Sequence, residues 1–227
     1  MEAIDRKSIV DLLLTKSALK QDIFQDTQKV FLDLKKVLNE EVSSLKADIT
    51  DDRIRMQYID KGEFEAQVFV GSDVLLFHRH TNVFLLPDSH PFWKLDYLKK
   101  NPENGYFGII YIYNFLAQSF IQGRMEDPGY LLGRVFINCE GHFFIEGKGP
   151  LGSSFKNIEN KKINSKILKQ IILTSFAYAV DFDLLTPPFE LVSQINVRQI
   201  QAISAGLSMQ TGKRLGFKFE KEENEFF

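Results

Sequence analysis

The sequence predicts an α+β protein, in which an antiparallel β-meander sheet is packed by a long N-terminal helix and two C-terminal helices. Helical periodicity runs through residues 5–47 and returns after residue 151. Between them, residues 53–148 form aromatic-rich segments with two-residue alternation, joined by short turn sequences. Parallel neighbours would need long crossovers, so these short turns favour antiparallel pairing.

Composition is typical of a globular chain: 44% of the 227 residues are hydrophobic and 26% are charged. We expect one domain over 1–227, divided into a helical segment (1–50), a sheet (51–150) and helices with a closing strand (151–227). The 28 basic residues nearly balance the 30 acidic ones, which argues against a nucleic-acid partner. No apolar run approaches the ~20 residues of a membrane span. The single cysteine, Cys139, excludes an internal disulfide and favours a cytoplasmic location.

The first predicted element is a helix over residues 5–47, with a break near residues 15–17 where Ser17 caps the second part. Apolar residues recur at seven-residue spacing and, with their neighbours, form one wide face that is typical of packing on a core. The alternative is a helix that dimerises the protein, which would make it a homodimer. The repeating residues are Phe24, Phe31, Leu38 and Leu45.

Strands follow the helix, separated by turn residues such as Gly62 and the segment 127–129. Residues 87–105 connect two strands and contain a short helix that begins at Pro91, with Asp88 or Ser89 as its cap. Residues 115–122 fit either a helix or a strand, and we favour the helix. The predicted strands are 53–60, 63–70, 74–80, 82–86, 106–113, 130–138 and 143–148.

After the sheet, the glycine-rich segment 147–154 is expected to be a flexible loop at a boundary. A strongly apolar helix follows over about residues 163–179. Asn196 and Gln199 resemble a capping box at the start of a second helix. Residues 214–220 alternate and predict a half-buried strand that returns to the sheet.

The strongest indication of a functional site in the sequence is a pair of histidines, His78 and His80. Residues two apart on a strand share a face, so both imidazoles can reach one divalent metal ion. The plain alternative is a pair of half-buried histidines that bond to the backbone. The third ligand would come from the turn near residue 140 or from the loop after the strand: Glu140, His142, Asp88 or His90.

Aromatic residues beside the predicted connections are candidates for ligand binding, because they bury a large area at little entropic cost. The alternative is that they cover the core. Together with the basic side chain next to the histidines, the candidate set is Trp93, Tyr97, Tyr106, Tyr130 and Arg79.

Weaker patterns favour structural roles. Cys139 and His142 are close enough in sequence for a thiol and its base, but single cysteines usually pack. The segment 147–154 lacks the Lys-Ser or Lys-Thr pair of a phosphate loop. Glu126 and Asp127 are expected to be solvated in a turn.

The leading functional prediction is a non-catalytic intracellular module that binds a small ligand or a protein partner and needs no cofactor. Its support is mainly the absence of a catalytic constellation in the sequence. The alternative is a metal-dependent, hydrolase-like enzyme in which His78 and His80 hold a divalent ion that activates water.

Overall fold

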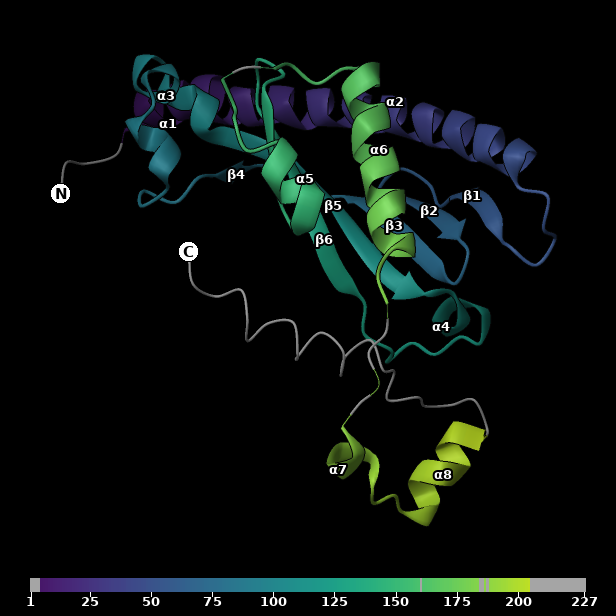
Figure 1. Cartoon of the computed structure of the whole chain (residues 1–227). Helices are drawn as coiled ribbons and strands as arrows, with labels where there is room; N and C mark the ends of the chain where they lie inside the picture. Colours follow the sequence, from purple (N-terminus) through teal and green to yellow (C-terminus); the bar gives the residue numbers. More distant parts are fainter. Residues whose placement is uncertain (1–4, 160, 184–185, 187, 205–227) are drawn as a thin grey trace.

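A computed structural model describes residues 5–159, 161–183, 186 and 188–204 of the chain. It confirms the predicted fold class, with a seven-stranded sheet in which every neighbouring pair is antiparallel (Figure 1). The order is β1-β2-β3-β5-β6-β7, and β4 pairs with the start of β5. The strands are β1 (Met56–Asp60), β2 (Glu65–Val70), β3 (Asp73–Arg79), β4 (Phe84–Leu85), β5 (Tyr106–Leu116), β6 (Tyr130–Ile137) and β7 (Phe143–Gly147).

The N-terminal helix runs without the predicted break. Helix α1 (Arg6–Leu12) continues through a π-helical turn, η1 (Leu13–Ser17), into α2 (Ala18–Asp48). Ser17 forms no side-chain capping bond, because the π turn absorbs the irregularity within the helix. Within the described residues, no helix combines the length and the apolar character needed to cross a membrane.

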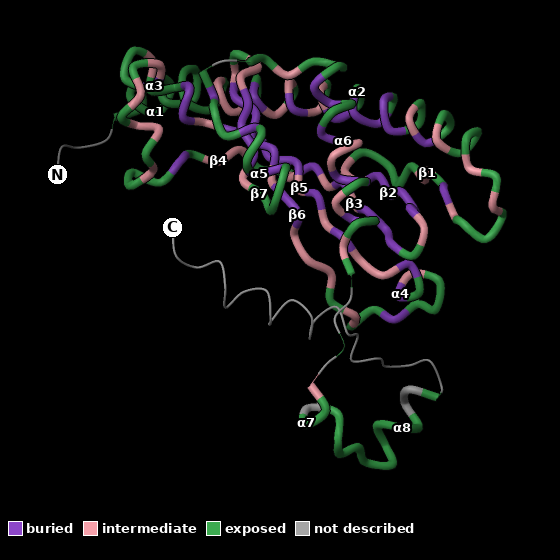
Figure 2. Tube along the Cα trace, viewed as in Figure 1, coloured by how far each residue is buried: buried purple, intermediate pink, exposed green. Residues whose placement is uncertain are grey.

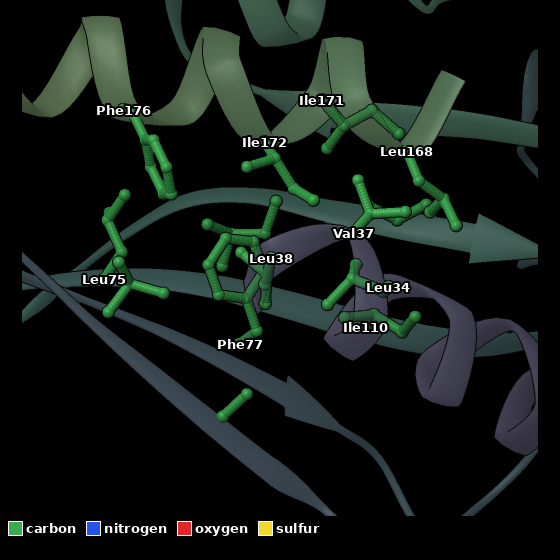
Figure 3. Packing of buried hydrophobic residues seen from close by; sticks show 14 of the residues in the cluster. Leu34, Val37, Leu38, Leu75, Phe77, Ile110, Leu168, Ile171, Ile172 and Phe176 are labelled. Atoms are coloured by element: carbon green, nitrogen blue, oxygen red, sulfur yellow. The ribbon is translucent and has the colours of Figure 1, made fainter. Parts of the chain in front are cut away.

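The main core lies between the sheet and two helices, α2 and α6 (Ser165–Val180), which cover the same face (Figures 1 and 2). This confirms that the wide apolar face of the long helix packs on the core. Burial of each large apolar side chain here stabilises the fold by about 1.5–3 kcal/mol. Figure 3 shows the interleaved residues, among them Leu34, Leu38, Phe77, Ile110 and Ile172.

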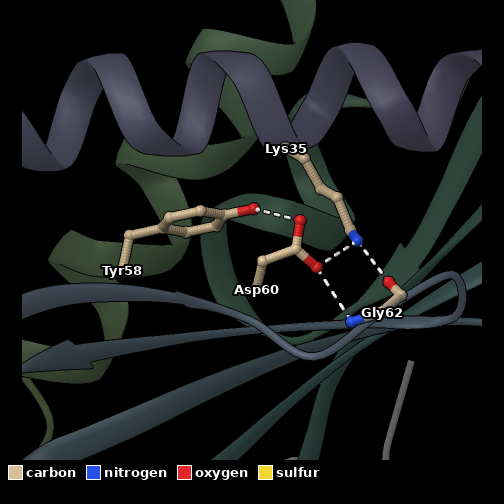
Figure 4. A network of polar contacts seen from close by, with 4 residues as sticks. All are labelled: Lys35, Tyr58, Asp60 and Gly62. Atoms are coloured by element: carbon tan, nitrogen blue, oxygen red, sulfur yellow. Dashed lines mark hydrogen bonds and ion pairs between the residues drawn. The ribbon is translucent and has the colours of Figure 1, made fainter.

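A polar network fastens α2 to the turn between β1 and β2 (Figure 4). Lys35 extends from the helix and donates to Asp60 Oδ1 at 2.6 Å and to the carbonyl of Gly62. The bond from Lys35 lowers the pKa of Asp60, and burial raises the pKa of Tyr58, its other neighbour, to about 12. Gly62 has φ +91°, which favours glycine. The predicted turn is thus present and held to the helix.

The predicted flexible loop at 147–154 is wrong, because its second part forms helix α5 (Gly149–Ser154). Leu151 is fully buried in the main core, and this burial orders the segment. A Cβ at Gly152 would lie 2.0 Å from the carbonyl oxygen of Gly147, so the turn requires glycine at this position. Helix α6 follows, capped by Asn164, whose side chain accepts from the amide of Ile167 at 3.1 Å.

Two short helices, α7 (Phe189–Val192) and α8 (Val197–Ser204), come last among the described residues. The predicted capping box is confirmed: Gln199 N donates to Asn196 Oδ1 at 2.8 Å, and Asn196 N donates to Gln199 Oε1 at 3.0 Å. Its helix lies apart from the sheet, and Val197 and Ile200 are exposed (Figure 2). The predicted closing strand, 214–220, lies outside the described residues.

In the described part of the chain, the opposite face of the sheet is covered towards its two ends. One end is covered by α4 (Ala117–Ile121), so the ambiguous 115–122 segment combines the end of a strand with a helix. The other end is covered by the segment between β4 and β5. That segment contains η2 (Pro91–Lys94), α3 (Asp96–Lys100) and η3 (Pro102–Gly105).

The cap of η2 is His90, and the prediction of Asp88 or Ser89 is wrong. His90 Nδ1 accepts from the amide of Phe92 at 3.3 Å. The imidazole reaches this amide because His90 immediately precedes the first residue of η2, which is the N-cap position.

The turn after α4 is held by a buried ion pair, which corrects the expectation of a solvated carboxylate for Asp127, whereas Glu126 is exposed as expected. Arg124 Nε donates to Asp127 Oδ2 at 2.7 Å, and Ser119 Oγ donates to the same oxygen at 2.6 Å. Both charged side chains are at most 5% exposed. The two charges neutralise each other, so their burial is tolerated. Because Ser119 belongs to α4 and bonds the same carboxylate oxygen, this cluster ties the loop to α4 and has a structural role.

Candidate functional site

A row of polar and aromatic side chains crosses the less covered face of the sheet. The register pairs Glu65 with His78, His78 with Tyr111, Tyr111 with Arg134, and Arg134 with Glu146. Directly paired residues on antiparallel strands project from the same face, so these five form one continuous line over β2, β3, β5, β6 and β7. Each is only partly buried, which leaves the row accessible.

A pocket of about 250 Å³ lies beside the β5–β7 part of this row. Its floor consists of Phe107, Ile109 and Phe136, which project from β5 and β6. Its wall is residues 84–87, the chain that includes β4 and leads into the covering segment. Tyr111 also lines the pocket. The cavity therefore has a mainly apolar and aromatic interior.

Three polar side chains converge at one end of the pocket: His90, Arg134 and Glu146. The guanidinium of Arg134 donates to Glu146 Oε2 and lies over the ring of Phe136, 5.2 Å from its centroid. The other carboxylate oxygen, Oε1, is 4.0 Å from Nε2 of His90. An apolar cavity with a few convergent polar groups is the common form of a small-molecule site.

The predicted metal ligands are not gathered at one point. His78 and His80 do share a face as expected, with their rings 6.5 and 6.0 Å from that of Tyr111. Glu140 and His142, however, belong to the turn between β6 and β7. Across the part of the chain that is described, no three His, Cys, Asp or Glu side chains are arranged to hold a metal ion.

Backbone bonds engage three of these imidazoles: His90 at the start of η2, described above, and also His80 and His142. For His80 this is the plain alternative that the sequence offered. His80 Nδ1 accepts from the amide of Asn82 at 2.9 Å. His142 Nδ1 lies 2.8 Å from the carbonyl oxygen of Ile158. Because one nitrogen of each ring is taken up in this way, these side chains order the local backbone.

The predicted aromatic ligand residues line other parts of the structure. Trp93 donates from Nε1 to the carbonyl of Pro87 at 2.9 Å, so it contacts a residue of the pocket wall without lining the pocket itself. The ring of Tyr106 faces Lys20, and the hydroxyl of Tyr130 accepts from Asn114 at 3.0 Å. Arg79 is fully buried beneath α2, on the face opposite the pocket.

Tyr97 lies in the polar network that shapes the β6–β7 turn. Its hydroxyl accepts from Asn138 at 2.8 Å and donates to Glu140 at 2.9 Å, and its ring is 4.9 Å from that of His142. Burial raises the pKa of Tyr97, so the phenol stays neutral. Asn138 also accepts from the amide of His142 at 3.0 Å. The structure thus gathers three predicted site residues, but in a network that orders the turn.

Cys139 is expected to react slowly with iodoacetamide in the folded protein. Burial, followed by the charge of Glu140, raises the pKa of the thiol, and Sγ donates to Asn104 Oδ1 at 3.3 Å. A raised pKa leaves less thiolate at neutral pH, so the rate should increase on unfolding in urea and with rising pH. Mass spectrometry of alkylated protein measures this rate. Faster alkylation of the folded chain than of the unfolded one would restore the nucleophile hypothesis.

Similarity to known proteins does not identify a function for this chain. The sequence matches no protein-family profile, and comparisons with curated proteins and with solved structures give no match. We therefore infer function from the pocket and the row of side chains beside it.

Proposed function

We propose that this protein is a non-catalytic binding module that holds a small, mainly apolar ligand in the sheet pocket. The observation that carries the proposal is the convergence of His90, Arg134 and Glu146 at one end of an apolar cavity. The aromatic floor supplies buried contact area, and the polar end orients the ligand. Tyr111 extends this surface along the open face.

The pocket chemistry favours binding over catalysis. Among the described residues that line it, none is a serine, threonine, cysteine or lysine, and its one carboxylate, Glu146, is bonded to Arg134. The charged groups Arg134 and Glu146 neutralise each other. The proposal keeps a cytoplasmic location, which the single cysteine, Cys139, supports because it needs no oxidising compartment.

Toluene and p-cresol are suitable probes of the pocket, with affinities expected at about the millimolar level for ligands of this size. In a titration followed by ¹⁵N–¹H NMR, shift changes should concentrate on residues 84–90 and on the facing parts of β5 and β6. Tyr111→Ala should weaken binding about fivefold, because the ring that lines the pocket is lost.

Tyr113→Ala is the matched control. Tyr113 lies on the same strand and stacks on Tyr111 with centroids 5.7 Å apart, but it does not line the pocket. Its removal should change affinity less than twofold. Shift changes scattered over the whole protein, or equal losses in the two variants, would contradict the proposed site.

A further inference from the structure

The proton on the His90 imidazole faces the carboxylate of Glu146. Nδ1 accepts from the amide of Phe92 at 3.3 Å, so in the neutral ring the proton sits on Nε2. Nε2 is the atom 4.0 Å from Glu146 Oε1. A donor and an acceptor therefore face each other at the polar end of the pocket.

The separation of these two atoms is too long for a direct hydrogen bond, but an oxygen atom lying to the side of the line that joins them can contact both. An oxygen about 2.8 Å from each can accept from His90 and donate to Glu146. The second carboxylate oxygen, Oε2, is already engaged by Arg134, which fixes the direction of Oε1. The gap thus has the donor and acceptor arrangement that a hydroxyl group satisfies.

We infer that the pocket recognises a hydroxylated aromatic molecule, a phenol or a close analogue, whose hydroxyl bridges His90 Nε2 and Glu146 Oε1. This inference rests on the proposed function and names its ligand class. A carbonyl oxygen only accepts and would leave Glu146 without a donor. An ammonium group only donates and would leave the proton on His90 without an acceptor.

The cavity walls favour an aromatic body for this ligand. Rings of Phe84, Phe107, Tyr111 and Phe136 line the space next to the polar end. Phe107 and Phe136 already form an edge-to-face pair, with centroids 6.0 Å apart. A further ring can join this cluster in the same edge-to-face or offset geometry, which is the preferred contact between aromatic groups.

Three probes of nearly equal shape distinguish the contribution of the hydroxyl group to affinity from that of the aromatic ring. p-Cresol can donate and accept, 4-methylanisole can only accept, and toluene can do neither. By NMR titration of the natural protein, p-cresol should bind about tenfold more tightly than the other two, because its hydrogen bond to Glu146 involves a charged acceptor. Equal affinity for the three would overturn the inference and leave the proposed function standing. If none of the three binds, the proposed function falls, and the inference falls with it.

Two substitutions of His90 test the bridge itself. His90→Asn keeps an acceptor at the cap position but removes the Nε2 donor, so the preference for p-cresol over toluene should fall to about twofold or less. His90→Gln places an amide donor near the ε position and should restore part of the preference. Loss of toluene binding together with p-cresol binding in His90→Asn would contradict hydroxyl recognition.

A second pair of variants tests the same bridge if His90→Asn does not fold. Glu146→Gln, compared with Glu65→Gln at the far end of the same row, should reduce the preference for p-cresol through loss of the charged acceptor. An unchanged preference in Glu146→Gln would overturn the inference.

Discussion

Glu63→Ala is expected to destabilise the protein by about 3 kcal/mol, because it leaves the guanidinium of Arg79 buried without an anion. Arg79 is fully buried, and its Nη2 donates to Glu63 Oε1 at 2.8 Å. The rings of Phe24 and Phe64 lie 4.6 and 4.5 Å from the guanidinium carbon. Nε and Nη1 have no hydrogen-bond partner among the residues that the structure describes. Burial lowers the pKa of Arg79, and Glu63 opposes this shift.

Arg79→Met should behave in the opposite way and leave stability unchanged within about 1 kcal/mol, because it removes both the desolvation cost and the unpaired groups. A methionine side chain also packs well against two aromatic rings. Urea unfolding monitored by circular dichroism gives the free energy of unfolding of each variant. Glu65→Ala, next but one along the chain, is the control and should cost less than about 1 kcal/mol. Equal large losses in Glu63→Ala and Arg79→Met would contradict this assessment of the pair.

Gly108→Ala is expected to cost about 2–3 kcal/mol, because helix α2 lies directly on β5 at this residue. A Cβ there would lie 2.0 Å from Oγ1 of Thr27 and 2.8 Å from its Cβ. Thr27 is buried, and its hydroxyl donates to the carbonyl of Ile23 at 2.7 Å. The helix must therefore move away from the sheet to admit the methyl group.

The double variant Thr27→Ala/Gly108→Ala tests this contact. In the Thr27→Ala background the cost of Gly108→Ala should fall by about 1 kcal/mol, because Oγ1 and Cγ2 are gone while Cβ remains. Gly133→Ala is the control: its nearest contacts would be 3.3 Å, so its cost should be below that of Gly108→Ala. An identical cost of Gly108→Ala in both backgrounds would show that Thr27 is not the obstacle.

The elements that the sequence predicts correctly are those with a strong local signal. In β5, apolar Ile110 and Ile112 alternate with half-exposed Tyr111 and Tyr113, and this alternation alone indicates a strand with one better-buried face. The capping box at Asn196 is equally local, since both partners lie within one helical turn. Such signals need no knowledge of distant residues.

The pocket residues were less accessible to sequence reasoning. The turn at 139–142 places Arg134 opposite Glu146, so the register of the predicted hairpin carries a signal for this ion pair that the sequence analysis does not use. The sequence predicts His90 only as a metal ligand, because its roles as a cap and as a pocket residue depend on where residues 84–94 lie on the sheet. The buried position of Arg79 has the same origin: alternation assigns it to a face, but only packing shows that α2 closes over that face.

By itself, the sequence determined the long N-terminal helix, helices α6 and α8, the strands and the antiparallel order of the meander, because periodicity and turn chemistry act over a few residues. Only the tertiary structure decided which histidines form hydrogen bonds or ion pairs with other residues, that Leu151 orders α5, and that His90 faces Glu146 at the polar end of the pocket. These outcomes depend on contacts between residues far apart in the chain. Their energies come from burial and charge pairing, which exist only after the sheet and its covering segments have packed together.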